Sequence, residues 1–391
     1  MKPRIVPAVA AALAAALAAC ESVTAPTGPG AAAERAIAAG DFHSCRLTET
    51  GDAFCWGNNR AGQIGDASLA NRSTPARVEG GPPFRSITAG ALHSCALDEE
   101  GKAFCWGGNL SGALGLPVAM QAFPAEAWPG FRFKSIGAGM QHTCGITLEG
   151  AAYCWGSNAN GQLGVRTLTG SSQPVAVEGG LRFESLSVGP LHTCAITADN
   201  AAYCWGLNTS GQLGNGAYAT APRPVLVAGH KFIQVSAGLV HTCGVTRTGE
   251  AYCWGSNNRG QLGGPLPEID PPPACGACSA QPVRVAIDTR LTKIATGDLH
   301  SCALTEDGDA FCWGRNSFGQ LGIGQPVDRV SPQPVAGGLV FANLEGGARH
   351  TCGVTTDGST YCWGDNLRLQ IGNGGVGARR SEPTLVQIPE R

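Results

Sequence analysis

The stretch from His192 to Gly206, HTCAITADNAAYCWG, followed by Gly211-Gln-Leu-Gly214, decides the fold. Between Cys194 and Cys204, apolar and small residues alternate on each side of a polar centre, and this period of two is typical of β-strands. The polar centre has the length of a three-residue hairpin loop, whose last position requires a positive φ. Asn200 stands at that position, and after Gly it is the residue that tolerates this conformation best. The stretch therefore predicts two antiparallel strands joined by a tight turn.

The same unit occurs seven times along the chain. A His that opens His-Ser/Thr-Cys recurs in steps of 49 or 50 residues, with one step of 59, and Cys-Trp-Gly begins ten residues beyond each such Cys. The six other copies have Gly as the last residue of the hairpin loop. A fixed period near fifty residues indicates a propeller, a solenoid or an array. The repeated histidines are His43, His93, His142, His192, His241, His300 and His350.

The composition agrees with a β-protein outside the reducing cytosol. The 391 residues include 57 Gly and 25 Pro, and only 14% are charged, which argues against helical bundles and favours short strands joined by turns. Seventeen cysteines argue against a resting cytosolic protein unless they bind metal. The formal net charge of −2 argues against a polybasic nucleic-acid binder, so we expect no nucleic-acid partner.

The N-terminal residues predict an export signal and a lipid anchor. Lys2 and Arg4 precede an apolar run that is too short to span a bilayer comfortably. The run ends in Leu-Ala-Ala-Cys20, which resembles the bacterial lipobox and implies that Cys20 is lipidated as the first mature residue. An ordinary secretory signal with a chance Cys is the alternative. We expect a signal peptide over 1–19, a flexible tether over 20–34, a propeller over 35–391 and a membrane-anchored lipoprotein on the periplasmic or cell-surface side.

The hairpin register places the two cysteines of each copy opposite each other, within reach of a disulfide. The remaining pair, Cys275 and Cys278, follows three prolines rather than a helix N-terminus, so a structural clip is favoured over a redox or zinc site. The seventeenth cysteine is then Cys20. The expected disulfides are Cys45–Cys55, Cys95–Cys105, Cys144–Cys154, Cys194–Cys204, Cys243–Cys253, Cys275–Cys278, Cys302–Cys312 and Cys352–Cys362.

Two further strands complete each copy. One precedes the His, as in Phe183-Glu-Ser-Leu186, and the other begins with Pro, as in Pro174-Val-Ala-Val177. Because Pro is tolerated only at strand starts and edges, the Pro strand should be outermost. No such strand precedes Ala36, whereas Pro383-Thr-Leu-Val386 lies at the C-terminus. We therefore expect the C-terminal strand to complete the first blade and close the ring, which removes the exposed edges of an open array.

These motifs resemble the repeats of the regulator of chromosome condensation family. The resemblance rests on Gly-x-x-His, the strand–turn–strand that ends in Trp-Gly, and Asn-x-x-Gly-Gln-Leu-Gly, and it covers roughly residues 35–391. It implies an all-β fold, a seven-bladed β-propeller with four antiparallel strands per blade. Ala113 replaces Gln in the second copy and Leu369 replaces Gly in the seventh; these departures concern the two loops and not the fold.

Repetition in every copy favours structural roles, because a functional site usually needs one special copy. We expect the histidines to be spread around the ring and to bond neighbouring turns rather than to bind one metal ion. The repeated tryptophans should pack between blades, and the repeated asparagines should cap turns. No phosphate-binding loop, zinc-protease motif or nucleophile elbow is found, and the acids are scattered without a close pair. We therefore expect no enzyme activity, metal or cofactor.

Strand direction predicts a binding face. The long connections after Gly-Gln-Leu-Gly should share a face with the Gly-x-x-His turns, and five of the seven residues just before each His are apolar. Such residues would form an apolar floor at the channel mouth, suited to a protein ligand, unless the loops simply cover them. The candidate contact residues are Trp128, Phe123 and Met120 in the second long connection, and Phe42, Leu92, Leu191 and Leu299 before the histidines.

The favoured function is that of a non-catalytic, lipid-anchored extracytoplasmic propeller that binds a protein or a glycan through this face. A first alternative is an inhibitor of a cell-envelope enzyme, resembling propeller-type β-lactamase inhibitor proteins. Nucleotide exchange on a small GTPase, which the family resemblance suggests, conflicts with the export signal and the cysteine pairing. A hydrolase or lyase is the remaining alternative, since propellers can host sites that sequence hides.

Overall fold

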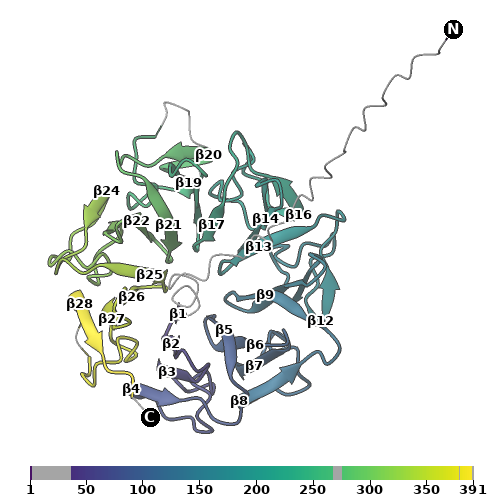
Figure 1. Ribbon diagram of the computed structural model, residues 1–391, viewed down its shortest axis with the longest axis vertical. Coiled ribbons are helices and arrows are strands. Elements are labelled where there is room, and N and C mark those ends of the chain that lie inside the picture. Colours follow the sequence, from purple (N-terminus) through teal and green to yellow (C-terminus); the bar gives the residue numbers. More distant parts are fainter. Residues whose placement is uncertain (2–36, 267–274, 378, 390–391) are drawn as a thin grey trace.

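The computed structural model describes Met1 and residues 37–266, 275–377 and 379–389. Its strands form seven four-stranded antiparallel sheets, arranged as blades in a ring around a central axis (Figure 1). No helix of the described residues is long and apolar enough to cross a membrane. The predicted signal peptide beyond Met1 and the whole of the predicted tether, with Cys20, lie outside the described ranges. The prediction of a seven-bladed, all-β propeller is confirmed.

Each blade uses four consecutive strands of the chain. The strands are β1 (Ile37–Ala39), β2 (His43–Leu47), β3 (Ala53–Gly57), β4 (Arg72–Arg77), β5 (Phe84–Ala89), β6 (His93–Asp98), β7 (Ala103–Gly108), β8 (Met120–Ala127), β9 (Phe133–Ala138), β10 (His142–Thr147), β11 (Ala152–Gly156), β12 (Ser171–Ala176), β13 (Phe183–Val188), β14 (His192–Thr197), β15 (Ala202–Gly206), β16 (Ala221–Leu226), β17 (Gln234–Ala237), β18 (His241–Val245), β19 (Ala251–Ser256), β20 (Cys278–Arg284), β21 (Leu291–Thr296), β22 (His300–Thr305), β23 (Ala310–Gly314), β24 (Arg329–Pro334), β25 (Phe341–Gly346), β26 (His350–Thr355), β27 (Thr360–Gly364) and β28 (Arg380–Val386).

The first strand of each blade lines the axis and the fourth lies at the periphery (Figure 1). Every peripheral strand contains proline, for example Pro174 in β12 and Pro282 in β20. An outermost strand has one edge without a partner, so it tolerates a residue that cannot donate a backbone hydrogen bond. The predicted position of the proline strand is confirmed.

The central hairpin of each blade is built as the sequence predicts. Cys194 faces Cys204 across β14 and β15, with 4.1 Å between their Cα atoms, and the other six hairpins repeat the pairing at 4.0 or 4.1 Å. The hairpin loop of the fourth blade ends at Asn200, whose φ is 64°. Cys275 and Cys278 are also joined. All eight predicted disulfides are therefore present in the structure.

The C-terminal strand does not complete the first blade, so the predicted closure is wrong. The first blade already has four strands of its own and ends in β4, whereas β28 pairs with β27 and completes the seventh blade. The reason is the order of strands within a blade. Because the chain runs from the axis outward, the proline strand ends its own repeat rather than opening the next, and no repeat lacks one.

Side chains join the blades to one another. The indole of each repeated Trp is buried and donates a hydrogen bond to a backbone carbonyl of the preceding blade, as from Trp106 to Gln63 at 3.0 Å. At the departure in the second copy, Trp155 donates to the carbonyl of Ala113, so the loss of a Gln side chain leaves this bond intact. Leu369 keeps the positive φ, 68°, of the glycines that it replaces. Neither departure disturbs the propeller.

The repeated histidines form a second ring of bonds. All seven are buried, and each Nε2 lies 2.7–3.1 Å from the Ser or Thr hydroxyl that follows the His of the next blade. In all seven blades this hydroxyl in turn donates to the carbonyl that also accepts the Trp bond, as Ser94 does to Gln63 at 3.0 Å and Thr193 does to Gln162 at 3.4 Å. The hydroxyl must then accept from an Nε2–H, so the imidazole is the neutral Nε2–H tautomer. The predicted structural role is confirmed, although the partner is a hydroxyl and not a turn.

Candidate functional site at the channel mouth

The Gly-x-x-His turns and the long connections lie on one face of the ring. His43 begins β2 and is paired with Gly57, the last residue of β3, and Gly57 is also paired with Arg72, the first residue of β4. The turn before β2 and the connection from β3 to β4 therefore meet at the same end of the blade. The hairpin loops lie at the opposite end. We call the first of these the turn face, and its predicted composition is confirmed.

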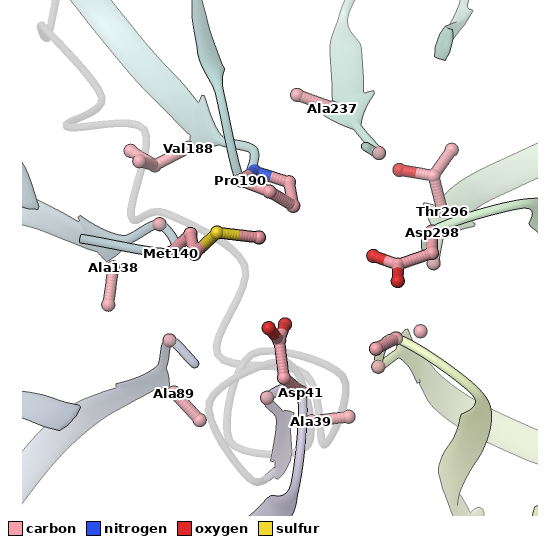
Figure 2. A pocket seen from close by; sticks show the side chains of 18 residues that line it. Ala39, Asp41, Ala89, Ala138, Met140, Val188, Pro190, Ala237, Thr296 and Asp298 are labelled. Carbon is pink, nitrogen blue, oxygen red and sulfur yellow. The ribbon is translucent and has the colours of Figure 1, made fainter. Parts of the chain in front are cut away.

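The central channel opens on the turn face through a cavity lined, in most of the blades, by the residue that follows the turn glycine. Asp41, Met140, Pro190, Asp298 and Ala348 occupy this position in five of the blades and line the cavity (Figure 2). A larger cavity continues between the innermost strands. The channel mouth is thus a ring with one residue from each contributing blade, and its chemistry is set by the residue type at one repeated position.

Two carboxylates that are far apart in the sequence belong to this ring. Asp41 precedes β2 and Asp298 precedes β22, and both side chains point into the cavity (Figure 2). Burial raises the pKa of Asp41 to about 6 against the opposing effect of Arg349. Burial, and next the charge of Asp41, raise the pKa of Asp298 to about 7. The two acids therefore face one cavity, although they are far apart in the sequence.

Arginines lie beside the carboxylates on the turn face. Arg349 is exposed in the turn before β26, and Arg315 is half-buried directly after β23. The guanidinium carbons of Arg315 and Arg349 lie 5.0 and 4.9 Å from the centre of the Phe318 ring. Burial first, and then the charges of Arg349 and Arg259, lower the pKa of Arg315. Positive charge is therefore concentrated where the sixth and seventh blades meet.

The predicted contact residues lie elsewhere than expected. The residues before the histidines (Phe42, Leu92, Leu191 and Leu299) are half-buried, and the cavity at the channel mouth is lined by the residues one position earlier. Met120 and Phe123 are 41% and 48% exposed, but they lie on the peripheral strand β8 and not on a free connection. Trp128 follows β8 and packs against the core of the second blade, where a Cβ at Gly115 would meet its indole.

Sequence reasoning missed Asp41, Asp298 and the group around Phe318. A signal was present, because the residue after each turn glycine can be compared between copies and only two of the seven are charged. The prediction rested instead on the residue just before each His, because the sequence of a turn does not show which of its residues faces the axis. The complete set after the glycines is Asp41, Ala91, Met140, Pro190, Leu239, Asp298 and Ala348.

The charged groups of the site can take part in ionic contacts. Carboxylates and guanidinium groups on a rigid rim can pair with charged groups of a ligand. Among the described residues, no three His, Cys, Asp or Glu side chains are placed to hold a metal ion together. Every residue of the rim is held by backbone that the blades fix, so a ligand would meet a preformed surface.

Short segments of known proteins are similar in sequence to this chain. Ultraviolet-B receptor UVR8 of Arabidopsis thaliana is 43% identical over 56 residues, which are 14% of this chain and 13% of the receptor. Probable E3 ubiquitin-protein ligase HERC6 of Homo sapiens is 43% identical over 49 residues, 12% of this chain and 5% of the ligase. The matches thus span only a small part of these relatives.

Solved structures share the fold at low sequence identity. Prp20p from Saccharomyces cerevisiae, studied for its binding to Gsp1p and histones, has a TM-score of 0.78 and 23% identity over 86% of each chain. Human WBSCR16 has a TM-score of 0.76 and 20% identity over 86% of this chain and 94% of that one. These likenesses establish the propeller architecture.

Family models cover most of the propeller. The model of the RCC1-like domain matches residues 170–391. Two models of the regulator of chromosome condensation (RCC1) repeat match residues 35–63, 84–113 and 133–162, and residues 50–97. The matched segments carry the turn glycines, histidines and Trp-Gly pairs that build the blades. The chain therefore belongs to the family of proteins built from regulator of chromosome condensation repeats.

Proposed function

We propose that this chain is a non-catalytic binding propeller that works outside the cytosol and holds a protein partner on its turn face. Its eight disulfides are suited to an oxidising compartment. The structural relative Prp20p binds proteins, which agrees with a binding role for a propeller of this type. The mechanism is rigid display, in which the blades fix the loops before binding and so lower the cost of ordering them.

One observation carries this proposal. The residues that repeat in all copies have structural roles, since the histidines, tryptophans and cysteines are buried between or within blades. The residues that break the repeat and remain accessible gather on the turn face, among them Asp298, Phe318 and Arg349. Variation on a rigid frame is the arrangement expected of a surface that recognises a specific partner.

Site-specific photo-crosslinking in the native envelope tests this function. Leu110 is 85% exposed on the turn face, and Leu148 is 57% exposed on a hairpin of the opposite face, so each can be replaced by a photoreactive amino acid without disturbing the core. We expect a defined protein adduct from position 110 and none from position 148. Adducts from both positions alike, or from neither, would reject the turn face as the binding surface.

The anchor is part of the same proposal and has its own test. Lipidation of Cys20 would tether the propeller through the 20–34 segment. Metabolic labelling with a radioactive fatty acid should mark the wild-type protein, and the label should be absent from Cys20→Ser. If the wild-type protein carries no label and mass spectrometry finds an unmodified N-terminus, the anchor is rejected and the binding function stands on the crosslinking alone.

A further inference from the structure

The group at the junction of the sixth and seventh blades departs most from the repeat. We call Arg315, Phe318 and Arg349 the arginine clamp. In the other six blades the residue equivalent to Arg349 is Phe42, Leu92, Gln141, Leu191, Val240 or Leu299, so no other blade has a cation there. The clamp is therefore particular to one place on the turn face and is no part of the common architecture.

Hydrogen bonds fix the backbone that carries Arg315 and Phe318, and one more positions the Arg315 side chain. The Arg315 N–H donates to the carbonyl of Leu299 at 2.9 Å, and the Phe318 N–H donates to Oε1 of Gln320 at 3.0 Å. Nε of Arg315 donates to the hydroxyl of Ser317 at 2.8 Å. Both guanidinium groups lie about 5 Å from the centre of one aromatic ring, a separation within the range of cation–π contacts.

The two guanidinium groups share one aromatic ring, and the acids beside them, Asp41, Asp298 and Asp328, form no ion pair with either. Within the described part of the chain, neither Arg315 nor Arg349 forms an ion pair, whereas neighbouring Arg259 reaches Asp328 at 3.5 Å. Contact with an aromatic face leaves the in-plane N–H groups of a guanidinium free to donate. An incoming anion would pair with these donors and relieve the repulsion between the two cations.

We propose that the arginine clamp binds the carboxylate of an acidic segment in the protein partner. This inference rests on the proposed function and names the chemistry of that partner. A carboxylate fits the clamp because guanidinium groups bind it through two parallel hydrogen bonds. A nucleic acid is a poorer fit, since binding along a phosphate backbone needs an extended basic surface and this chain has a formal net charge of −2.

Binding of a fluorescein-labelled hexaglutamate peptide to the purified full chain tests the clamp. We expect saturable binding that weakens as salt rises from about 50 to 300 mM, and that is about tenfold weaker in Arg349→Gln. Arg349 is exposed and should tolerate the change, which an unchanged melting temperature would verify. Arg247→Gln is the matched control, because Arg247 is exposed on a hairpin of the opposite face, and it should bind as the wild type does.

The competing outcomes are distinct. Absence of peptide binding, or equal binding by wild type and Arg349→Gln, would overturn the clamp. Tighter Arg349-dependent binding of a heparin tetrasaccharide than of hexaglutamate would assign the site to an anionic glycan and also overturn it. Self-association of the wild type that Arg349→Gln abolishes would make a second copy the occupant. If the partner crosslinks to position 110 equally in Arg349→Gln, the binding function holds and the clamp fails.

Discussion

The ring of buried histidines should make the propeller sensitive to acid. Burial lowers the pKa of each of the seven from 6.5 to between about 3 and about 4, and in several of them the charge of a neighbouring His adds to the effect. Below pH 6.5 these histidines are therefore protonated in the unfolded chain but stay neutral in the folded protein until the pH is much lower. A depressed pKa in the folded state contributes stability above pH 6.5, and this contribution is lost as the pH falls.

The magnitude follows from the same values. A pH of 5 lies about 1.5 units below the pKa of an unfolded His. Protonation of that His therefore lowers the free energy of the unfolded state by about 2 kcal/mol, which the folded state does not gain. Seven of them give about 14 kcal/mol. Asp41 and Asp298 have the opposite effect, because their pKa values in the folded protein are raised to about 6 and about 7. Protonation of the two acids between pH 8 and pH 5 therefore stabilises the folded protein, by about 4 kcal/mol at most. The net loss of about 10 kcal/mol is comparable to the whole stability of a typical domain.

The assay is guanidinium unfolding at pH 7.5 and at pH 5 with the disulfides oxidised, followed by the fluorescence of the buried tryptophans. We expect a much lower midpoint at pH 5. The variant His192→Gln removes one titrating group and keeps a donor for the Thr242 hydroxyl, which His192 contacts at 2.7 Å. Its stability should fall less between the two pH values than that of the wild type, by about 2 kcal/mol.

The eighth histidine supplies the control. His230 lies outside the ring and stacks on Tyr252 with 3.9 Å between ring centroids. His230→Gln should lose stability between pH 7.5 and pH 5 as the wild type does. If the wild-type midpoint is the same at both pH values, or if His192→Gln and His230→Gln respond alike, the reasoning from the buried ring is refuted.

Four further outcomes follow from single features of the structure. Replacing Cys194 and Cys204 together by Ser should lower the unfolding free energy by about 2–3 kcal/mol in denaturant titrations under oxidising conditions. Asn200→Gly should leave the melting temperature nearly unchanged, whereas Asn200→Val should lower it, because φ is 64° there. Trp128→Ala should cost about 2–3 kcal/mol, since the side chain is packed into the second blade, and unchanged stability would mean that it is a free surface anchor. Asp298→Asn should stabilise the protein at pH 8.5 and have little effect at pH 4, measured by thermal unfolding, because the raised pKa makes the ionised form the costly one.

The sequence predicts well whatever depends on neighbours in the chain. The hairpin between Cys194 and Cys204 needs only alternation and a residue that accepts a positive φ, so strands, turn and disulfide could be predicted together. The boundaries between blades could not be predicted in this way. A repeat in a ring can be cut at any point with the same period, and only the hydrogen bonds of β28 with β27 show that the proline strand ends a blade.

The candidate site was less predictable for a geometric reason. Asp41 and Asp298 are far apart in the sequence and share only their position after a turn glycine. They approach each other because the ring brings the first and sixth blades to the same axis, on either side of the seventh (Figure 1). The sequence pattern predicted which turns and connections share a face but not which residue of each turn lines the channel mouth, because burial is easier to infer than the direction of a side chain.

Closure of the ring explains why function should lie in the exceptions to the repeat. The junction of the seventh and first blades uses the same bonds as the others, since His350 contacts the Ser44 hydroxyl at 2.8 Å and Trp56 donates to the carbonyl of Gln370 at 2.9 Å. No strand is exchanged, so each copy must keep its His, hydroxyl and Trp for the ring to stay closed. Loss of one of these groups removes a buried bond from a junction, whereas Arg349 is exposed and reaches the neighbouring blade only through the face of the Phe318 ring. Specificity can therefore be changed there without a loss of the fold.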